Sequence, residues 1–124
     1  MIDLEKCKNL FRIYVDNYDM NDDKINLKYY HTFRVMNFCR EIAKDLYLDS
    51  EDVEIAELIG LLHDIGRFEQ IRVYNTFIDK DSIDHADYGV NILKSDNFIE
   101  KFVSDDTIQN IVLVAIYNHI ISLL

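Results

Sequence analysis

Residues 49–66 read DSEDVEIAELIGLLHDIG, and this stretch decides the fold. Its interior, residues 55–62, is apolar on almost every side of a helix, and such a helix belongs in the middle of a domain. Asp49 or Ser50 can cap its start. Gly66 is predicted to end it in the left-handed position that favours glycine.

Helical spacing of apolar residues continues toward the N-terminus. A first helix is predicted over about residues 3–18, from Leu4, Cys7, Phe11, Tyr14 and Tyr18. A second is capped by Asp22 or Asp23 and runs to about residue 47. Its predicted inward stripe consists of His31, Val35, Phe38, Ile42 and Leu46.

The C-terminal half is predicted to be helical after a connecting segment. Residues 67–83 carry no strong period and are expected to form a loop with a short helical turn. A helix follows over about residues 84–95, then a short segment over 97–103, then a last helix capped by Asp105 or Asp106. The stripes of these two helices are His85, Tyr88, Gly89 and Ile92, and Ile108, Ile111, Val112, Ala115 and His119. With no period-two alternation, repeat or linker, residues 1–124 are expected to form one all-α domain.

Composition and charge narrow the function classes. The chain has 124 residues, of which 49% are hydrophobic, and 23 acidic against 13 basic side chains give a net charge of −10. An acidic surface repels phosphate backbones, so a nucleic-acid polymer is not expected as a partner. A small phosphorylated substrate would need local positive charge from Arg, Lys or a metal.

The sequence favours a cytoplasmic protein without a membrane partner. Cys7 and Cys39 are too few for a disulfide framework, and both lie in apolar helical stripes as expected of buried thiols. The N-terminus lacks the apolar core of a signal peptide. The longest apolar stretch, Ile111–Leu124, is interrupted by polar residues and too short to span a bilayer.

Four histidines lie on the inward stripes of four different predicted helices: His31, His63, His85 and His119. A single buried imidazole usually has a hydrogen-bond partner in the core, and that explanation stays open for each. Four buried imidazoles each need a partner or a desolvation cost of about 1–3 kcal/mol. A shared metal ion would satisfy them together, as ligands do in the cores of helix bundles.

Asp64 strengthens the metal hypothesis. It follows His63 at the end of the most apolar helix, where a carboxylate is costly without a cation or several donors. The alternative is a cap or a salt bridge to Arg67. Imidazole and carboxylate ligands suit Mn, Fe, Zn, Ni or Co better than calcium or a thiolate-preferring metal.

These residues resemble the H…HD signature of the HD-domain superfamily, which consists of all-α, metal-dependent phosphohydrolases. His31 lies in HTFRV and His63-Asp64 in LLHDIGR, while DHADYG (residues 84–89) and AIYNH (residues 115–119) resemble the third and fourth histidine motifs of members with two metals. The resemblance covers about residues 28–120 and implies an HD-domain-like bundle of about five to six helices.

By this resemblance, one or two divalent metal ions would be held by His31, His63, Asp64, His85 and His119. The metal would activate a water and neutralise phosphoryl charge, with Asp64 bridging two metals or orienting the hydroxide. Arg67, a predicted catalytic residue, and Arg34 would bind substrate phosphate. Ordinary structural functions stay open for both: Arg34 pairing with a surface carboxylate, and Arg67 capping the preceding helix. A homodimer is also left open.

One departure from the family pattern affects the function. The family closes its metal site with an Asp on a helix beyond the last histidine, and the printed chain has no such residue after His119; Asp105 and Asp106 precede it. The first hypothesis is therefore a metal-dependent phosphohydrolase acting on a nucleotide or other small phosphoester. The alternative is a catalytically incomplete metal- or ligand-binding regulatory HD module, followed by a plain helical interaction domain with satisfied core histidines.

Overall fold

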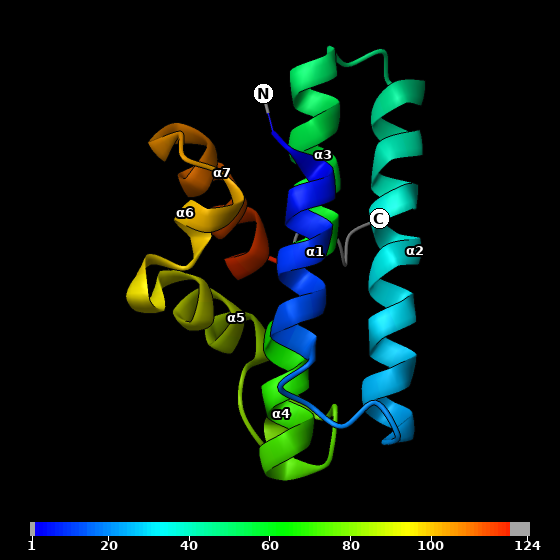
Figure 1. Cartoon of the computed structure of the whole chain (residues 1–124), viewed down its shortest axis with the longest axis vertical. Coiled ribbons are helices and arrows are strands. Elements are labelled where there is room, and N and C mark those ends of the chain that lie inside the picture. Colours follow the sequence, from blue (N-terminus) through cyan, green and yellow to red (C-terminus); the bar gives the residue numbers. More distant parts are fainter. Residues whose placement is uncertain (1, 120–124) are drawn as a thin grey trace.

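Helix α3 (Ser50–Leu62) lies at the centre of the molecule, as its apolar sequence predicts (Figure 1). Asp49 caps its start by accepting a hydrogen bond from the backbone N–H of Asp52. Leu58 and Leu61 have no exposed surface. The structure, a computed structural model, describes residues 2–119.

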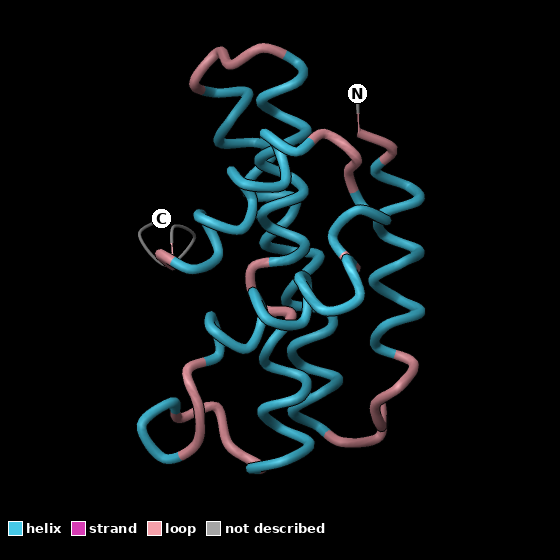
Figure 2. Tube along the Cα trace, turned by 90° about the vertical axis from the view of Figure 1, so that its left-hand side faces the viewer, coloured by secondary structure: helices cyan, strands magenta, loops and turns pink. Residues whose placement is uncertain are grey.

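Three other helices pack against α3, and the trace contains only helices and loops over the described residues (Figure 2). The helices besides α3 are α1 (Leu4–Val15), α2 (Asp23–Asp45), α4 (Gly66–Tyr74), α5 (His85–Lys94), the single turn α6 (Ile99–Phe102) and α7 (Asp106–Tyr117), with 3₁₀ turns η1 (Asp79–Asp81) and η2 (Ser95–Asn97). Helix α2 packs alongside α3, α1 lies in front of α3, and α5, α6 and α7 lie on the side away from α2 (Figure 1). The predicted all-α bundle is confirmed.

Aspartate side chains define most helix starts. Asp22, Asp84 and Asp105 accept backbone N–H hydrogen bonds at the first turns of α2, α5 and α7. This interaction satisfies donors that a helix end leaves without partners. Because it depends on one residue and its immediate neighbours, these starts agree with the sequence prediction.

The predicted inward stripe of α2 is wrong over its C-terminal half. Phe38 and Leu46 are each 65% exposed, whereas Met36, Cys39 and Ala43 are buried against the rest of the molecule. The cause is close packing on α3: a Cβ atom at Gly60 would lie 2.9 Å from the Met36 Cα. Helix α2 therefore turns toward α3 a face of smaller residues than the predicted stripe. Of the other stripe residues, Ile42 is exposed and His31 and Val35 are half-buried.

The expectation of a loop over residues 67–83 is wrong in its first part, where α4 lies. This helix buries Phe68 and Ile71 together with Gln70, which has no exposed surface. A polar residue at a buried position breaks the apolar period, and the sequence pattern therefore missed the helix.

Gly66 does not end α3 in a left-handed conformation, since no glycine among the described residues has a positive φ. It is the first residue of α4 and lies against α5 instead. A Cβ atom at this position would lie 2.2 Å from the backbone oxygen of His85 and 2.7 Å from the backbone nitrogen of Gly89. Glycine is required here because the two backbones approach too closely for any side chain.

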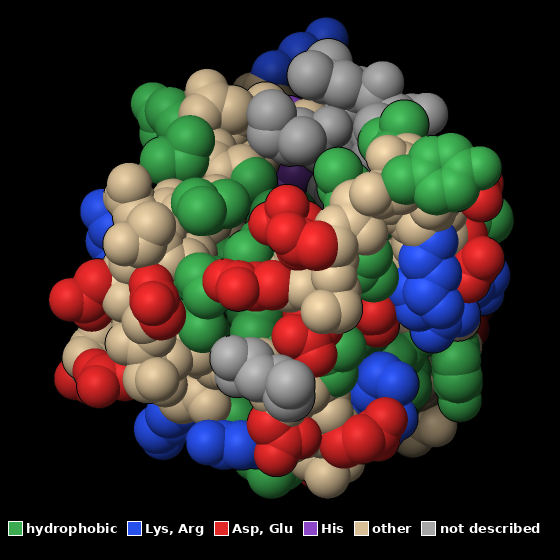
Figure 3. All heavy atoms as spheres, turned by 90° about the horizontal axis from the view of Figure 1, so that it is seen from above, with side chains coloured by type: hydrophobic (Ala, Val, Ile, Leu, Met, Phe, Trp, Pro, Cys, Tyr) green, Lys and Arg blue, Asp and Glu red, His purple; other side chains and the backbone are tan. Residues whose placement is uncertain are grey.

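The surface and the thiols agree with the sequence expectations where the structure tests them. Cys7 and Cys39 are buried and unpaired, and burial raises the pKa of Cys7 to about 11. Acidic side chains gather on the end of the molecule seen in Figure 3. Within residues 2–119, no helix combines the length and the apolar character needed to cross a bilayer.

We expect Gly66→Ala to lower the free energy of unfolding by about 2 kcal/mol or more, because the new methyl group must push two backbones apart. Gly89→Ala is the matched control. Its Cβ would meet its nearest neighbour, the Ile65 side chain, at an ordinary 3.4 Å, and alanine favours the helix by up to about 1 kcal/mol. Urea unfolding of both variants checks this; equal losses of stability would contradict the close-packing argument.

Candidate metal centre

The predicted ligands lie where α2, α3, α5 and α7 come together. His31 is in the middle of α2, and His63 and Asp64 directly follow α3. His85 is the first residue of α5, and His119 follows the end of α7. Four helices that are distant in sequence therefore deliver their histidines to one region.

Three of these residues form a compact donor group. The ligand atoms of His31, His63 and Asp64 all lie within 4.8 Å of one another. Asp64 is only 7% exposed, and the two imidazoles are half-buried. Burial, followed by the charge of Lys28, lowers the pKa of His31 and keeps this imidazole in the neutral form that binds metals. The group offers two nitrogens and a carboxylate oxygen to one cation.

His63 is oriented by the helix that precedes it. Its Nδ1 lies 2.6 Å from the carbonyl oxygen of Gly60, which accepts, so Nδ1 carries the hydrogen. In the neutral ring Nε2 then has a lone pair, and it faces Asp64 Oδ2 at 3.2 Å. Two acceptors in contact require a proton or a metal ion between them.

His85 repeats this arrangement from the other side. Its Nδ1 lies 2.7 Å from Asp79 Oδ2, and its Nε2 faces Asp64 Oδ1 at 3.5 Å. A histidine that donates one ring N–H to a carbonyl or carboxylate, and presents the other nitrogen, is typical of metal ligands. Both oxygens of Asp64 therefore face imidazole nitrogens.

His119 extends the cluster beyond His85. The two rings are 5.1 Å apart between centroids, and His119 is half-buried with a left-handed φ of 53°. Each of the five predicted ligands thus lies next to at least one other, although His85 and His119 lie outside the compact group of three. A second acidic group, Asp79, Asp84 and His85, is a weaker candidate because Asp84 is exposed and caps α5.

The family model of the HD domain matches residues 29–123. The chain belongs to the HD domain family. No curated protein and no solved structure matches it closely enough to count as a relative. The matched segment contains all five predicted ligands, and HD domains are metal-dependent phosphohydrolases that bind divalent metals.

The aspartate that the family pattern places beyond the last histidine has no counterpart in residues 120–124, which contain no aspartate and lie outside the described residues. The assignment of five ligands stays a prediction, supported by the geometry of residues 31–119.

The donor set of the HD domain fits a divalent cation. Asp64 is buried beside the His63 and His85 imidazoles, and burial alone would raise its pKa. Hydrogen bonding and charge from His63 and the Lys28 ammonium outweigh burial, and the pKa of Asp64 is held well below its usual range. The carboxylate is therefore ionised and available as a ligand.

From the sequence, a lysine just before a buried stripe is expected to be solvated, but Lys28 lies in the site. Its Nζ lies 2.9 Å from Asp64 Oδ2, and its side chain is 15% exposed. The ammonium also lies 5.2 Å from the ring centre of Phe77. The available signal was its position three residues before His31, which places both side chains on one face of α2.

The two arginines predicted to bind phosphate differ in their surroundings. Arg67 Nη1 donates to Asp79 Oδ1 at 2.9 Å, to the Phe77 carbonyl at 2.8 Å and to Gln70. It therefore anchors the segment that follows α4, and its buried Nε has no hydrogen-bond partner and lies 3.9 Å from Asp64 Oδ1. Arg34 is exposed on α2.

Asp79 is a site residue that sequence reasoning missed. Asp79 is half-buried, and its Oδ1 accepts from Arg67 and Gln70 while its Oδ2 accepts from His85. Burial raises its pKa, but the hydrogen bonds from His85 and Gln70 prevail and lower it to about 2. Asp79 therefore connects Arg67 and Gln70 of α4 to the ligand candidate His85.

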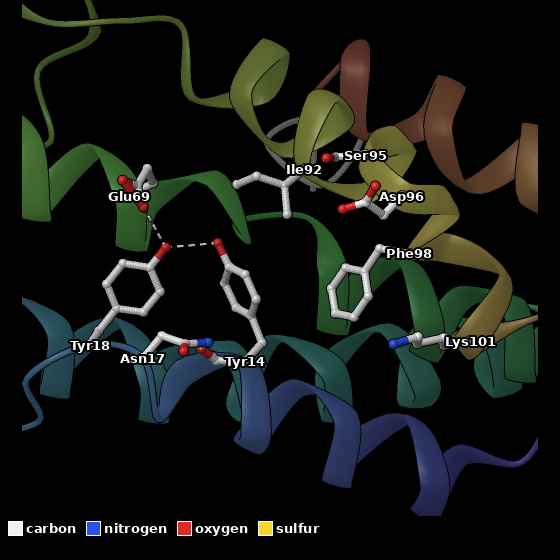
Figure 4. Close-up of a pocket in the computed structure, with 9 residues that line it drawn as sticks. All are labelled: Tyr14, Asn17, Tyr18, Glu69, Ile92, Ser95, Asp96, Phe98 and Lys101. Carbon is white, nitrogen blue, oxygen red and sulfur yellow. Dashed lines mark hydrogen bonds between the residues drawn. The ribbon is translucent and has the colours of Figure 1, made fainter.

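A separate hollow of about 500 Å³ lies away from the metal centre (Figure 4). None of the predicted site residues lines it. The hydroxyl oxygens of Tyr14 and Tyr18 lie 2.8 Å apart in a hydrogen bond, and the Tyr18 hydroxyl donates to Glu69 Oε2 at 2.7 Å. The hydroxyls of Tyr14 and Tyr18 and the Glu69 carboxylate are therefore hydrogen-bonded to one another. Because no predicted ligand lines the hollow, it is separate from the metal centre.

We expect Asp79→Asn to weaken Mn²⁺ binding by about 10- to 100-fold, the effect typical of losing an outer partner of a ligating histidine. Asparagine has one acceptor oxygen, whereas Asp79 uses one oxygen for His85 and the other for Arg67 and Gln70. Calorimetric titration measures the affinity. Asp81→Asn, exposed in the same turn, is the control; an unchanged affinity in Asp79→Asn would show that Asp79 does not position His85.

Proposed function

We propose that this HD domain is a metal-dependent phosphohydrolase that acts on a nucleotide or another small phosphoester. The observation that carries the proposal is the pair of imidazole Nε2 atoms, from His63 and His85, that face the two oxygens of buried Asp64. Each facing pair of atoms needs a proton or a metal ion between them, and one buried carboxylate between two imidazoles is suited to hold a metal. Family membership supports the same reaction class.

We assign the cation to His31, His63 and Asp64, with His85 and His119 as further ligands of one or two ions. Neutral imidazoles and a carboxylate suit Mn, Fe, Zn, Ni or Co. A divalent ion held there would lower the pKa of a water and neutralise charge on the phosphoryl group. Asp64 is the proposed catalytic carboxylate, since it lies between the histidines on either side.

We retain Arg34 and Arg67 as proposed phosphate contacts. Arg34 lies one turn after His31 and is open to solvent, and Arg67 lies beside Asp64. The proposed substrate is a small phosphorylated molecule rather than a nucleic-acid polymer, because the net charge of −10 disfavours an extended polyanion. A homodimer and a cytoplasmic location stay predictions.

The test combines metal content with turnover. Protein never exposed to chelators is expected to hold about one equivalent or more of a transition metal at neutral pH, and to hydrolyse at least one member of a phosphoester panel. His63→Ala and Asp64→Asn should lose most of both, since each removes a donor of the compact group. Asp45→Asn, exposed at the end of α2, is the control and should keep both.

The remaining function classes predict different results. Stoichiometric metal with no turnover of any phosphoester would favour a regulatory module that binds metal without chemistry. Metal well below one equivalent, unaffected by His63→Ala and His85→Ala, would favour a plain helical interaction domain.

A further inference from the structure

Lys28 holds a charge at a place where the proposed function needs one. Its ammonium is largely shielded from water and makes a 2.9 Å hydrogen bond to Asp64 Oδ2. The helix fixes its backbone, and Thr32 Oγ1 donates to its carbonyl oxygen one turn later. The aromatic ring of Phe77 lies 5.2 Å from the ammonium and confines it on another side.

The oxygen that Lys28 contacts also faces a ligand candidate. Asp64 Oδ2 lies 3.2 Å from His63 Nε2, so a metal ion held between these two atoms would contact the same oxygen. A divalent cation and an ammonium cannot share this oxygen without strong repulsion. A metal ion in the donor group and the Lys28 ammonium therefore compete for Asp64.

The other cations near the centre are placed differently. Arg67 Nη1 is committed to Asp79, Gln70 and the Phe77 carbonyl. Arg34 lies in solvent on the far side of His31 along the helix. A lysine is suited to change partners because its compact charge sits on a flexible stem with three donors.

We propose that Lys28 is a metal-gated phosphate-binding residue. Without metal, its ammonium neutralises Asp64 and takes no anion. When a divalent cation binds the donor group, the ammonium leaves Asp64 and donates to a phosphate oxygen of the substrate. This inference rests on the proposed function and adds an order of binding, with the metal first and the phosphate second.

The test measures binding of Mn²⁺ and of inorganic phosphate by calorimetry, without turnover. The wild-type chain should bind phosphate only after Mn²⁺ has been added. Lys28→Met should bind Mn²⁺ as tightly as the wild type or more tightly, because a competing cation has gone. Its affinity for phosphate in the presence of Mn²⁺ should fall by about 10- to 100-fold, as for loss of a charged hydrogen bond.

Two further variants separate a binding function from a structural one. Lys28→Arg keeps the charge and should restore at least part of the phosphate affinity. Lys24→Met removes an exposed lysine one turn earlier in α2, whose Nζ contacts only Asn75 among the described residues, and should behave as the wild type. Circular dichroism establishes that each variant is folded; if Lys28→Met does not fold, Lys28→Gln replaces it.

The outcomes are distinguishable. If the wild type binds no Mn²⁺, the proposed function itself fails. If Mn²⁺ binds and phosphate affinity is the same in wild type and Lys28→Met, only the inference about Lys28 is overturned. Phosphate binding to metal-free wild type with equal affinity would also overturn it, because the ammonium would then not be held by Asp64.

Discussion

The charge of Asp64 is the constraint on which the rest of the site depends. The carboxylate is 7% exposed and its two oxygens face imidazole nitrogens at 3.2 and 3.5 Å. An ionised carboxylate in such surroundings is costly unless positive charge and hydrogen bonds compensate it. The Lys28 ammonium supplies one positive charge, and a proton or a metal ion must lie between the carboxylate oxygens and the facing imidazole nitrogens. The composition of the centre follows from this requirement.

Two glycines place the ligands around that carboxylate. At Gly60, the lack of a side chain lets α2 approach α3, and this close packing brings His31 toward the end of α3. At Gly66, it lets the start of α5 approach α4, which brings His85 against the other oxygen of Asp64. The carbonyl of Gly60 also orients His63. The metal centre is therefore a consequence of close backbone packing on both sides of residues 63–64.

The sequence predicted those features that local chemistry determines. The aspartate caps gave the helix starts, and four histidines in four separate helices indicated a shared site. The face that α2 turns to α3 could not be predicted this way, because its large apolar residues, such as Phe38, stay exposed while the contact uses Cys39 and Ala43. Helix α4 was missed because Gln70 is buried through tertiary hydrogen bonds. Lys28 and Asp79 have partners 36 and 6 residues away, and no local pattern identifies such pairs.

The scarcity of free positive charge links the metal to the substrate. With a net charge of −10, the surface does not attract phosphate, so affinity must come from the few cations at the centre. Arg67 is tied to Asp79 and Lys28 to Asp64. If metal binding releases Lys28, then the metal strengthens phosphate binding, and thermodynamic linkage requires phosphate to strengthen metal binding by the same factor. A chain built this way holds its metal most tightly when substrate is present, because both ligands depend on the same ion pair being broken.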